Sequence, residues 1–145
     1  MPERERPLVE KLIVEANRLT RVAAQATGST TPAAVWRTLS ILASDGSYRI
    51  GDLAKASRVT QPTMTKLVQN LAEDELIYRI ADVADSRAWL IAITEKGTNA
   101  LAAWRIELGT ALQPMFADLS ADETDTLERA VTILESLTNP VRKGA

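Results

Sequence analysis

The sequence predicts a mainly α-helical (α+β) domain in which helices surround one two-stranded hairpin. Over most of its 145 residues, apolar side chains recur at three- and four-residue steps, the spacing of one buried helix face. One region instead holds two short apolar runs separated by a polar connector, as in a β-hairpin. The length fits one domain, so we expect residues 1–145 to form a single domain.

Composition restricts the chemistry of this chain. Apolar residues make up 46% and charged residues 25%, as in soluble globular proteins, and no apolar run is long enough to span a bilayer. The N-terminal residues show no secretory signal, so a cytoplasmic protein is expected. Cysteine and histidine are absent, which removes thiolate nucleophiles, the commonest general base and most zinc ligands. Because no carboxylate pair is recognisable either, we predict no enzyme, no catalytic residue, no cofactor and no metal.

Two helices are expected before residue 46. An apolar stripe over residues 8–26 predicts a helix of about five turns, which ends at the turn-forming residues 28–30. The second helix is expected to begin with Thr31 as N-cap and Pro32 as its first residue, because proline lacks only an N–H that would be unbonded there. It should end at residues 45–46.

The central segment predicts short elements joined by tight turns. Thr60 is a suitable N-cap for the longer of its two helices, and residues 82–87 form a polar connector suited to a hairpin loop. The expected elements are an edge strand at 47–49, helices at 50–57 and 60–74, and strands at 76–81 and 88–93.

Two further helices follow the hairpin. Thr94 is expected to cap the first, and Ser120 and Glu123 form a capping box that begins the second. With the first helix they carry more apolar residues than one small core requires, namely Leu8, Leu12, Leu101, Trp104, Phe116, Leu127, Leu134 and Leu137. Such a surplus usually marks an interface, so we predict a homodimer formed by residues 8–27 and 94–138. The alternative is that these helices pack against one another within one chain.

The two helices between residues 50 and 74 fit a helix-turn-helix. The net charge of the chain is −2, yet residues 46–72 contain four cations and one carboxylate, a local charge of +3. The polar side chains left outward on the second helix, which can hydrogen-bond base edges and phosphates, are Gln61, Thr63, Thr65, Lys66, Gln69 and Asn70. Any amphipathic helix pair leaves polar residues on its outer face, so the helix pair alone does not indicate DNA binding, and the hairpin that follows it is the additional evidence. Together they predict a winged helix-turn-helix at residues 46–93, with double-stranded DNA as partner.

The hairpin loop contains the cation best placed to reach a minor groove. Arg87 lies in this loop, and Asp85 precedes it by two residues, where its carboxylate can hold the loop in shape. The alternative is that both are solvated surface charges of little energetic effect.

Several of these segments together resemble the MarR (multiple-antibiotic-resistance regulator) family over roughly residues 50–101. The matching segments are Leu53-Ala54, residues 59–68, Leu71, Leu76-Ile77, Asp82, Asp85-Ser86-Arg87 and residues 93–97. The resemblance implies that the second helix enters the major groove, which Gln61, Pro62, Thr63, Thr65 and Lys66 would face, and that Arg87 reaches the minor groove with Asp85 as its support. Arg58 and Thr60, before that helix, complete the side chains expected to meet DNA. It also implies a homodimer in which the first and last helices intertwine.

The same resemblance raises two further expectations. Many members have glycine where Arg58 stands, so Arg58 should adopt a positive φ, and its side chain would then point towards the DNA backbone. A small aromatic or phenolic effector is implied between the dimerisation and DNA-binding parts. Trp36 and Trp104 are candidates to line such a ligand-binding pocket, although tryptophans at helical spacing are more often core residues.

The leading hypothesis is a sequence-specific DNA-binding transcription regulator, a ligand-responsive repressor acting as a homodimer on a pseudo-palindromic operator. One alternative is a winged-helix module that binds another protein without specific DNA binding. Another is a carboxylate-based hydrolase, which would show turnover. Binding to duplex DNA that weakens steeply with salt separates the first from the second.

Overall fold

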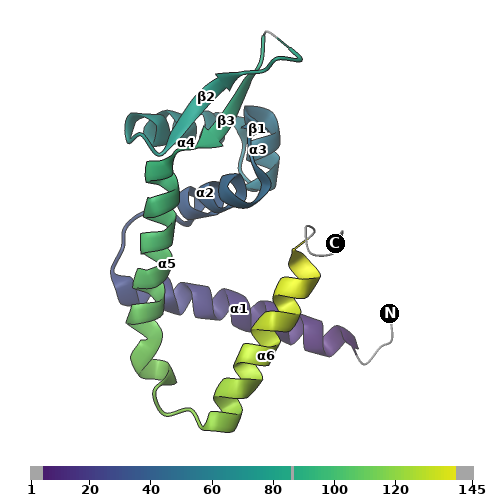
Figure 1. Cartoon of the computed structure of the whole chain (residues 1–145), viewed down its shortest axis with the longest axis vertical. Coiled ribbons are helices and arrows are strands. Elements are labelled where there is room, and N and C mark those ends of the chain that lie inside the picture. The colour runs from purple at the N-terminus through teal and green to yellow at the C-terminus, as the bar shows by residue number, and fades with distance from the viewer. Residues whose placement is uncertain (1–4, 86, 140–145) are drawn as a thin grey trace. The chain divides into compact units, whose positions relative to one another are not determined.

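The structure is a computed structural model that describes residues 5–85 and 87–139, and its elements follow the expected order (Figure 1). They are α1 (Glu5–Thr27), α2 (Ala33–Asp45), β1 (Tyr48–Arg49), α3 (Ile50–Ala56), α4 (Gln61–Glu73), β2 (Ile77–Ala81), β3 (Trp89–Ile93), α5 (Glu95–Phe116) and α6 (Ala121–Thr138). The predicted fold class is therefore confirmed. Contacts group the chain into two units that divide between residues 111 and 112, within α5.

The start of α2 differs from the prediction. Pro32 is the N-cap rather than the first helical residue, with an extended ψ of 143°, and no side chain caps the helix. Its carbonyl accepts a hydrogen bond from the Val35 N–H at 3.0 Å. Thr31 lies one residue too early to cap, and its N–H donates instead to the Ser29 hydroxyl at 3.3 Å.

The other predicted caps are confirmed. The Thr60 hydroxyl accepts from the Thr63 N–H at 3.3 Å at the start of α4. Ser120 and Glu123 form the reciprocal capping box of α6, with both hydrogen bonds at 3.0 Å. These side chains bond helix-end N–H groups that have no partner inside the helix.

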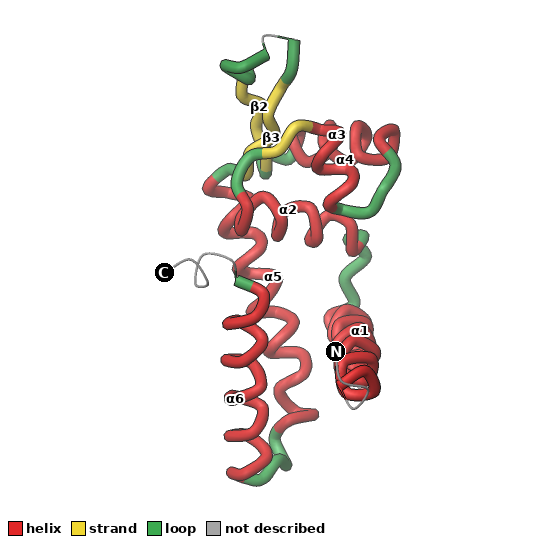
Figure 2. The backbone as a smooth tube through the Cα atoms, turned by 90° about the vertical axis from the view of Figure 1, so that its right-hand side faces the viewer, coloured by secondary structure: helices red, strands yellow, loops and turns green. Residues whose placement is uncertain are grey.

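The three strands form one small antiparallel sheet in the order β1-β3-β2. Two residues of β1 pair with β3 at its edge, as expected for so short a segment, and β2 pairs with β3 along five residues from Ile77↔Ile93 to Ala81↔Trp89. Figure 2 shows the β2–β3 hairpin projecting beyond α3 and α4. The sheet therefore places a protruding loop beside the helix-turn-helix.

The core lies between α2, the helix-turn-helix, the sheet and the first half of α5. Its buried cluster comprises Leu39, Leu42, Leu53, Ala54, Met64, Val68, Leu71, Ile77, Ile91 and Leu101. One polar pair is also buried: the Thr38 and Ser57 hydroxyls lie 3.0 Å apart. The Arg37 Nε donates to the Ser57 carbonyl at 2.8 Å. Together these contacts from α2 fix the end of α3 and hence the turn before α4.

The apolar faces of α1 and α6 lie largely outside this core. Among the described residues of α1 only Ala23 is buried, whereas Leu8 and Ile13 are 67% and 56% exposed. No residue of α6 is buried, and Leu137 is 60% exposed. Leu101 was expected in the surplus set but is 2% exposed within the core, so it is not available to a partner. No helix in the described part of the chain is long and apolar enough to cross a membrane.

Candidate nucleic-acid interface

Helix α4 has one buried face and one polar, exposed face. Met64, Val68 and Leu71 are buried on the core side. The exposed residues of α4 and its N-cap include those predicted to meet DNA, namely Thr60, Gln61, Pro62, Thr63, Thr65, Lys66 and Gln69, together with Asn70 and Glu73 nearer the end of the helix. Their side chains are short or flexible, so the helix presents hydrogen-bonding groups without bulk that would keep it out of a groove.

The hydroxyl groups at the start of α4 have defined roles. The Thr60 hydroxyl donates to the Thr63 Oγ1 at 2.8 Å, which leaves the proton of the Thr63 hydroxyl free to donate outward. The Thr65 hydroxyl donates to the Gln61 carbonyl at 3.0 Å, so its Oγ1 remains free to accept. One donor and one acceptor therefore stand two residues apart at the N-terminal end of the helix.

Asp85 determines the shape of the hairpin loop. Its Oδ1 accepts from the Arg87 N–H at 3.0 Å, its N–H donates to the Asp82 carbonyl at 3.2 Å, and its carbonyl accepts from the Ala88 N–H at 3.0 Å. Ser86 lies outside the described residues. The Arg87 side chain is exposed and bonds to no carboxylate of the described residues. The loop thus holds its backbone through Asp85 and leaves the guanidinium of Arg87 available.

An ion pair joins the first residue of the hairpin loop to β1. The Arg49 Nη2 and Nε lie 2.6 and 2.9 Å from the Asp82 Oδ2, and the Asp82 Oδ1 accepts from the Ala84 N–H at 2.9 Å. The Arg49 guanidinium, and after it the Ala84 N–H, hold the pKa of Asp82 below its ordinary value. The sequence pattern showed Arg49 only as a charge, because its partner lies 33 residues away.

The segment at residues 93–97 has a structural role. The Thr94 hydroxyl donates to the Glu75 carbonyl at 2.6 Å and accepts from the Gly97 N–H at 2.9 Å, while the Thr94 N–H donates to the Leu76 carbonyl at 3.0 Å. Glu75 has a positive φ of 62° in the turn that follows α4. These hydrogen bonds, which we call the Thr94 lock, fasten the end of α4 and the start of β2 to α5, so they position both α4 and the hairpin.

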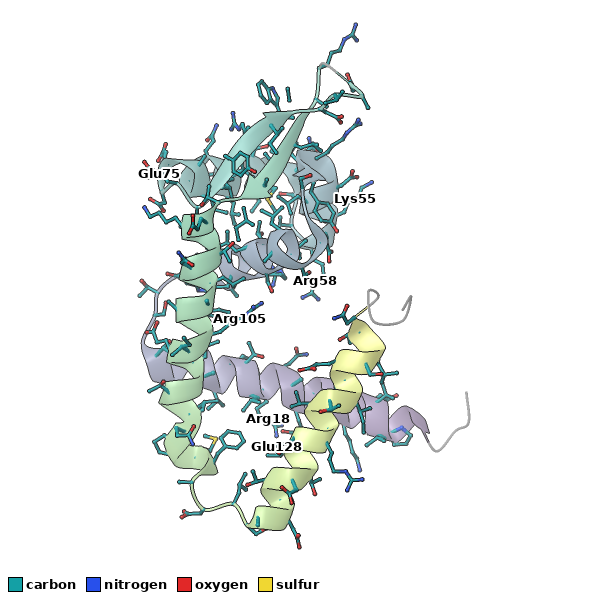
Figure 3. All side chains as sticks on the ribbon, in the orientation of Figure 1. Arg18, Lys55, Arg58, Glu75, Arg105 and Glu128 are labelled. Atoms are coloured by element: carbon teal, nitrogen blue, oxygen red, sulfur yellow. The ribbon has the colours of Figure 1, made fainter. Side chains whose placement is uncertain are left out.

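Arg58 is the one predicted DNA contact that the structure does not bring together with the others. Its φ is 58°, as expected for this turn. Its side chain lines a cavity of about 330 Å³ together with residues of α1, α2 and α5. Figure 3 shows Arg58 on the side of the helix-turn-helix opposite the hairpin, so the expected direction towards the DNA backbone is not observed.

Trp36 and Trp104 line the same cavity. Their rings stack with centroids 4.7 Å apart and planes inclined by 7°. The Trp36 Nε1 is buried and has no hydrogen-bond partner among the described residues. Both tryptophans also pack partly against the core. Each of them therefore lines the cavity, as one interpretation of the sequence expected, and contacts the core, as the other expected.

A helix-turn-helix with a polar, exposed second helix and an adjacent hairpin defines the class of winged-helix DNA-binding proteins. Residues 32–89 match the model of the MarR family. Over 99 residues the chain is 30% identical to an HTH-type transcriptional regulator of Mycobacterium bovis, covering 68% of this chain and 69% of that protein. The chain belongs to the MarR family and is a DNA-binding transcriptional regulator; such regulators are not enzymes.

Other relatives agree with this assignment. The homoprotocatechuate degradative operon repressor of Escherichia coli is 25% identical over 92 residues, 63% of this chain and 62% of the repressor. The transcriptional regulator Tm0710 of Thermotoga maritima has the same fold, with a TM-score of 0.72, 21% identity and coverage of 91% and 94% of the two chains. A Staphylococcus aureus MepR mutant bound to an oligodeoxyribonucleotide is also similar, with a TM-score of 0.61, 25% identity and coverage of 90% and 98%.

Proposed function

We propose that this regulator is a ligand-responsive repressor that binds a pseudo-palindromic operator as a homodimer. The polar face of α4 beside the Asp85-shaped loop is the observation that carries the proposal. Helix α4 enters the major groove, where the hydroxyls of Thr63 and Thr65 meet base edges and Lys66 meets a phosphate. Arg87 extends from the loop into the neighbouring minor groove.

The roles of these side chains differ in a measurable way. Replacing Thr63 or Thr65 by alanine is expected to lower operator affinity about tenfold while changing random-duplex affinity little, because base contacts specify sequence. Lys66→Ala should weaken both alike and reduce the slope of log K against log salt by about one unit. Fluorescence anisotropy with both duplexes at several salt concentrations measures these effects.

Thr126→Ala is the matched control for the loss of a helical hydroxyl. Thr126 bonds its i−4 carbonyl at 2.8 Å, as Thr65 does, but lies on α6. It should leave the ratio of operator to random-duplex affinity unchanged. If the Thr63 and Thr65 variants keep the parental ratio as well, α4 does not read bases.

The exposed apolar faces of α1 and α6 support the homodimer. Leu8, Ile13, Val131 and Leu137 are each more than half exposed, and faces of this kind are usually covered by a partner. A two-fold partner also supplies a second recognition helix, which a palindromic site requires.

We expect the protein to sediment as a dimer at micromolar concentration, and Leu137→Glu to weaken the dimer about a hundredfold by placing an unpaired charge in the interface. Thr138→Glu is the control, because it adds the same charge at the neighbouring exposed position, beside the apolar face and not within it. Analytical ultracentrifugation with circular dichroism separates dissociation from unfolding. A Leu137→Glu variant that remains as dimeric as the control contradicts this interface.

The cavity beside the stacked tryptophans supports an effector site. Its volume of about 330 Å³ is in the range that binds small organic molecules, and the tryptophan rings offer an aromatic wall to such a ligand. Arg58 connects the cavity to the turn before α4. The E. coli relative represses a homoprotocatechuate degradative operon, which is consistent with a small aromatic or phenolic effector for this chain.

A further inference from the structure

A hollow of about 310 Å³ lies at the base of the hairpin loop, and we call it the wing-base pocket. Its cationic lining consists of Arg49 from β1, Arg79 from β2 and Arg87 from the loop, with Trp89 beside them. It exists because β1 is only two residues long: the pairing of β1 with β3 ends at Arg49↔Leu90, whereas β2 continues to pair as far as Trp89. The edge of β3 beyond Leu90 is therefore left open.

Arg79 faces the same side of the sheet as the recognition helix. It pairs directly with Ile91, and residues directly opposite each other in antiparallel strands share a face. Ile91 is 1% exposed in the core cluster that also contains Met64 and Val68 of α4. Arg79 lies on this face but is exposed. The pocket that it lines includes Gly51 of α3, where a Cβ would lie 3.6 Å from the Gln61 Oε1 at the start of α4, so the pocket adjoins the N-terminal end of that helix.

Two of the three guanidinium groups have no anionic partner within the described part of the chain. Among the described residues neither Arg79 nor Arg87 forms an ion pair or a side-chain hydrogen bond, whereas Arg49 is held by Asp82. The carboxylates of Asp82, Asp85 and Asp52 all act on Arg49. A guanidinium that has no partner among the described residues keeps its N–H donors available for an external phosphate, which they can bind bidentately.

We propose that the wing-base pocket binds a backbone phosphate of the DNA, held chiefly by Arg79 with Arg87 at the rim. Arg49 forms the wall of the pocket, and Asp82 fixes its orientation. The bound phosphate lies beside the minor groove that Arg87 enters, so this contact sets the register of the wing on the duplex. The inference rests on the proposed DNA-binding mode and adds a sequence-independent contact to it.

Arg79→Ala tests this assignment. We expect about tenfold weaker binding at 0.1 M salt, equal for operator and random duplex, and a reduction of about 0.9 in the slope of log K against log salt, the value for one phosphate. Arg79→Lys should keep most of the slope. Arg129→Ala removes the same charge from an exposed site on α6 and should leave the slope unchanged.

A chemical change in the DNA locates the contact. Single methylphosphonate substitutions along the operator remove one phosphate charge at a time. At one position flanking the minor groove, the substitution should weaken binding by the parent but should not weaken binding by Arg79→Ala any further. This comparison is a double-mutant cycle between protein and DNA. Melting temperatures of all variants should match the parent, since Arg79 is exposed and unpaired.

The possible failures can be told apart. If the parent shows no salt-dependent duplex binding, the proposed function is wrong; if the parent binds and Arg79→Ala keeps its slope, only the phosphate site is wrong. A loss confined to the operator also contradicts the site, because it would indicate base reading. A further outcome is that inorganic phosphate protects the parent, but not Arg79→Ala, from thermal unfolding, while both proteins keep the same slope of log K against log salt for DNA. That result would identify a site for free phosphate and overturn the proposal.

Discussion

Gly97→Ala is expected to lower the free energy of unfolding by about 3 kcal/mol or more, the upper range for single substitutions. A Cβ at this position would overlap the Leu76 carbonyl oxygen and lie 2.8 Å from the Ile93 Cγ1. The carbonyl cannot withdraw freely, because it accepts the Thr94 N–H at 3.0 Å in the lock between the hairpin and α5. Chemical denaturation followed by circular dichroism measures the loss.

Gly109→Ala provides the control within the same helix. A Cβ at Gly109 meets nothing within 4 Å, so the substitution should raise stability, by up to about 1 kcal/mol, through the higher helix propensity of alanine. Opposite signs for two identical substitutions in α5 would show that Gly97 is required by close packing. If Gly97→Ala is as stable as the parent, the lock does not hold α5 against the hairpin as described.

Arg87→Ala and Asp85→Ala are expected to weaken DNA binding, each by about tenfold or more, with little change in melting temperature. Arg87 would lose its minor-groove contact, and the loss should be larger on operators flanked by A-tracts, whose narrow groove concentrates negative potential. Asp85→Ala removes the acceptor of the Arg87 N–H at 3.0 Å, so the loop would no longer present the arginine. Binding assays on A-tract and mixed-sequence duplexes measure both effects.

The sign of the Asp85 effect is decisive. Removing a negative charge near DNA should tighten binding if only long-range electrostatics acts. Asp118→Ala is the control, since it removes an exposed carboxylate outside the hairpin and should not weaken binding. Tighter binding by Asp85→Ala would mean that the aspartate is only a repulsive surface charge, and that the wing assignment is wrong.

Local patterns predicted much of the fold because they report local physics. The caps at Thr60 and Ser120 were predictable, because the side-chain oxygen of an N-cap residue accepts a hydrogen bond from the free N–H three residues later. The buried face of α4 followed from its 3.6-residue spacing. The start of α2 was misplaced by one residue because a threonine followed by proline offers two adjacent capping positions.

The features that the pattern did not reveal depend on contacts distant in sequence. Leu101 has the helical spacing of an interface residue, but α5 passes the sheet at that turn and buries it. Arg79 occurs within an apolar strand, and only the strand register shows that it faces the side of α4. Likewise, the positive φ of Arg58 was predictable, whereas the direction of its side chain depends on the cavity beside α2.

Two copies of this chain are expected to read a specific duplex through α4 and the hairpin loop. Selection of bound duplexes from a random pool, followed by salt titration of the enriched sequence, tests it most directly. We expect a palindromic site with half-sites about one helical turn apart, bound far more tightly than random duplex and with affinity that falls steeply as salt rises. A pool that shows no enrichment, or enrichment of a single unpaired half-site, would contradict the account.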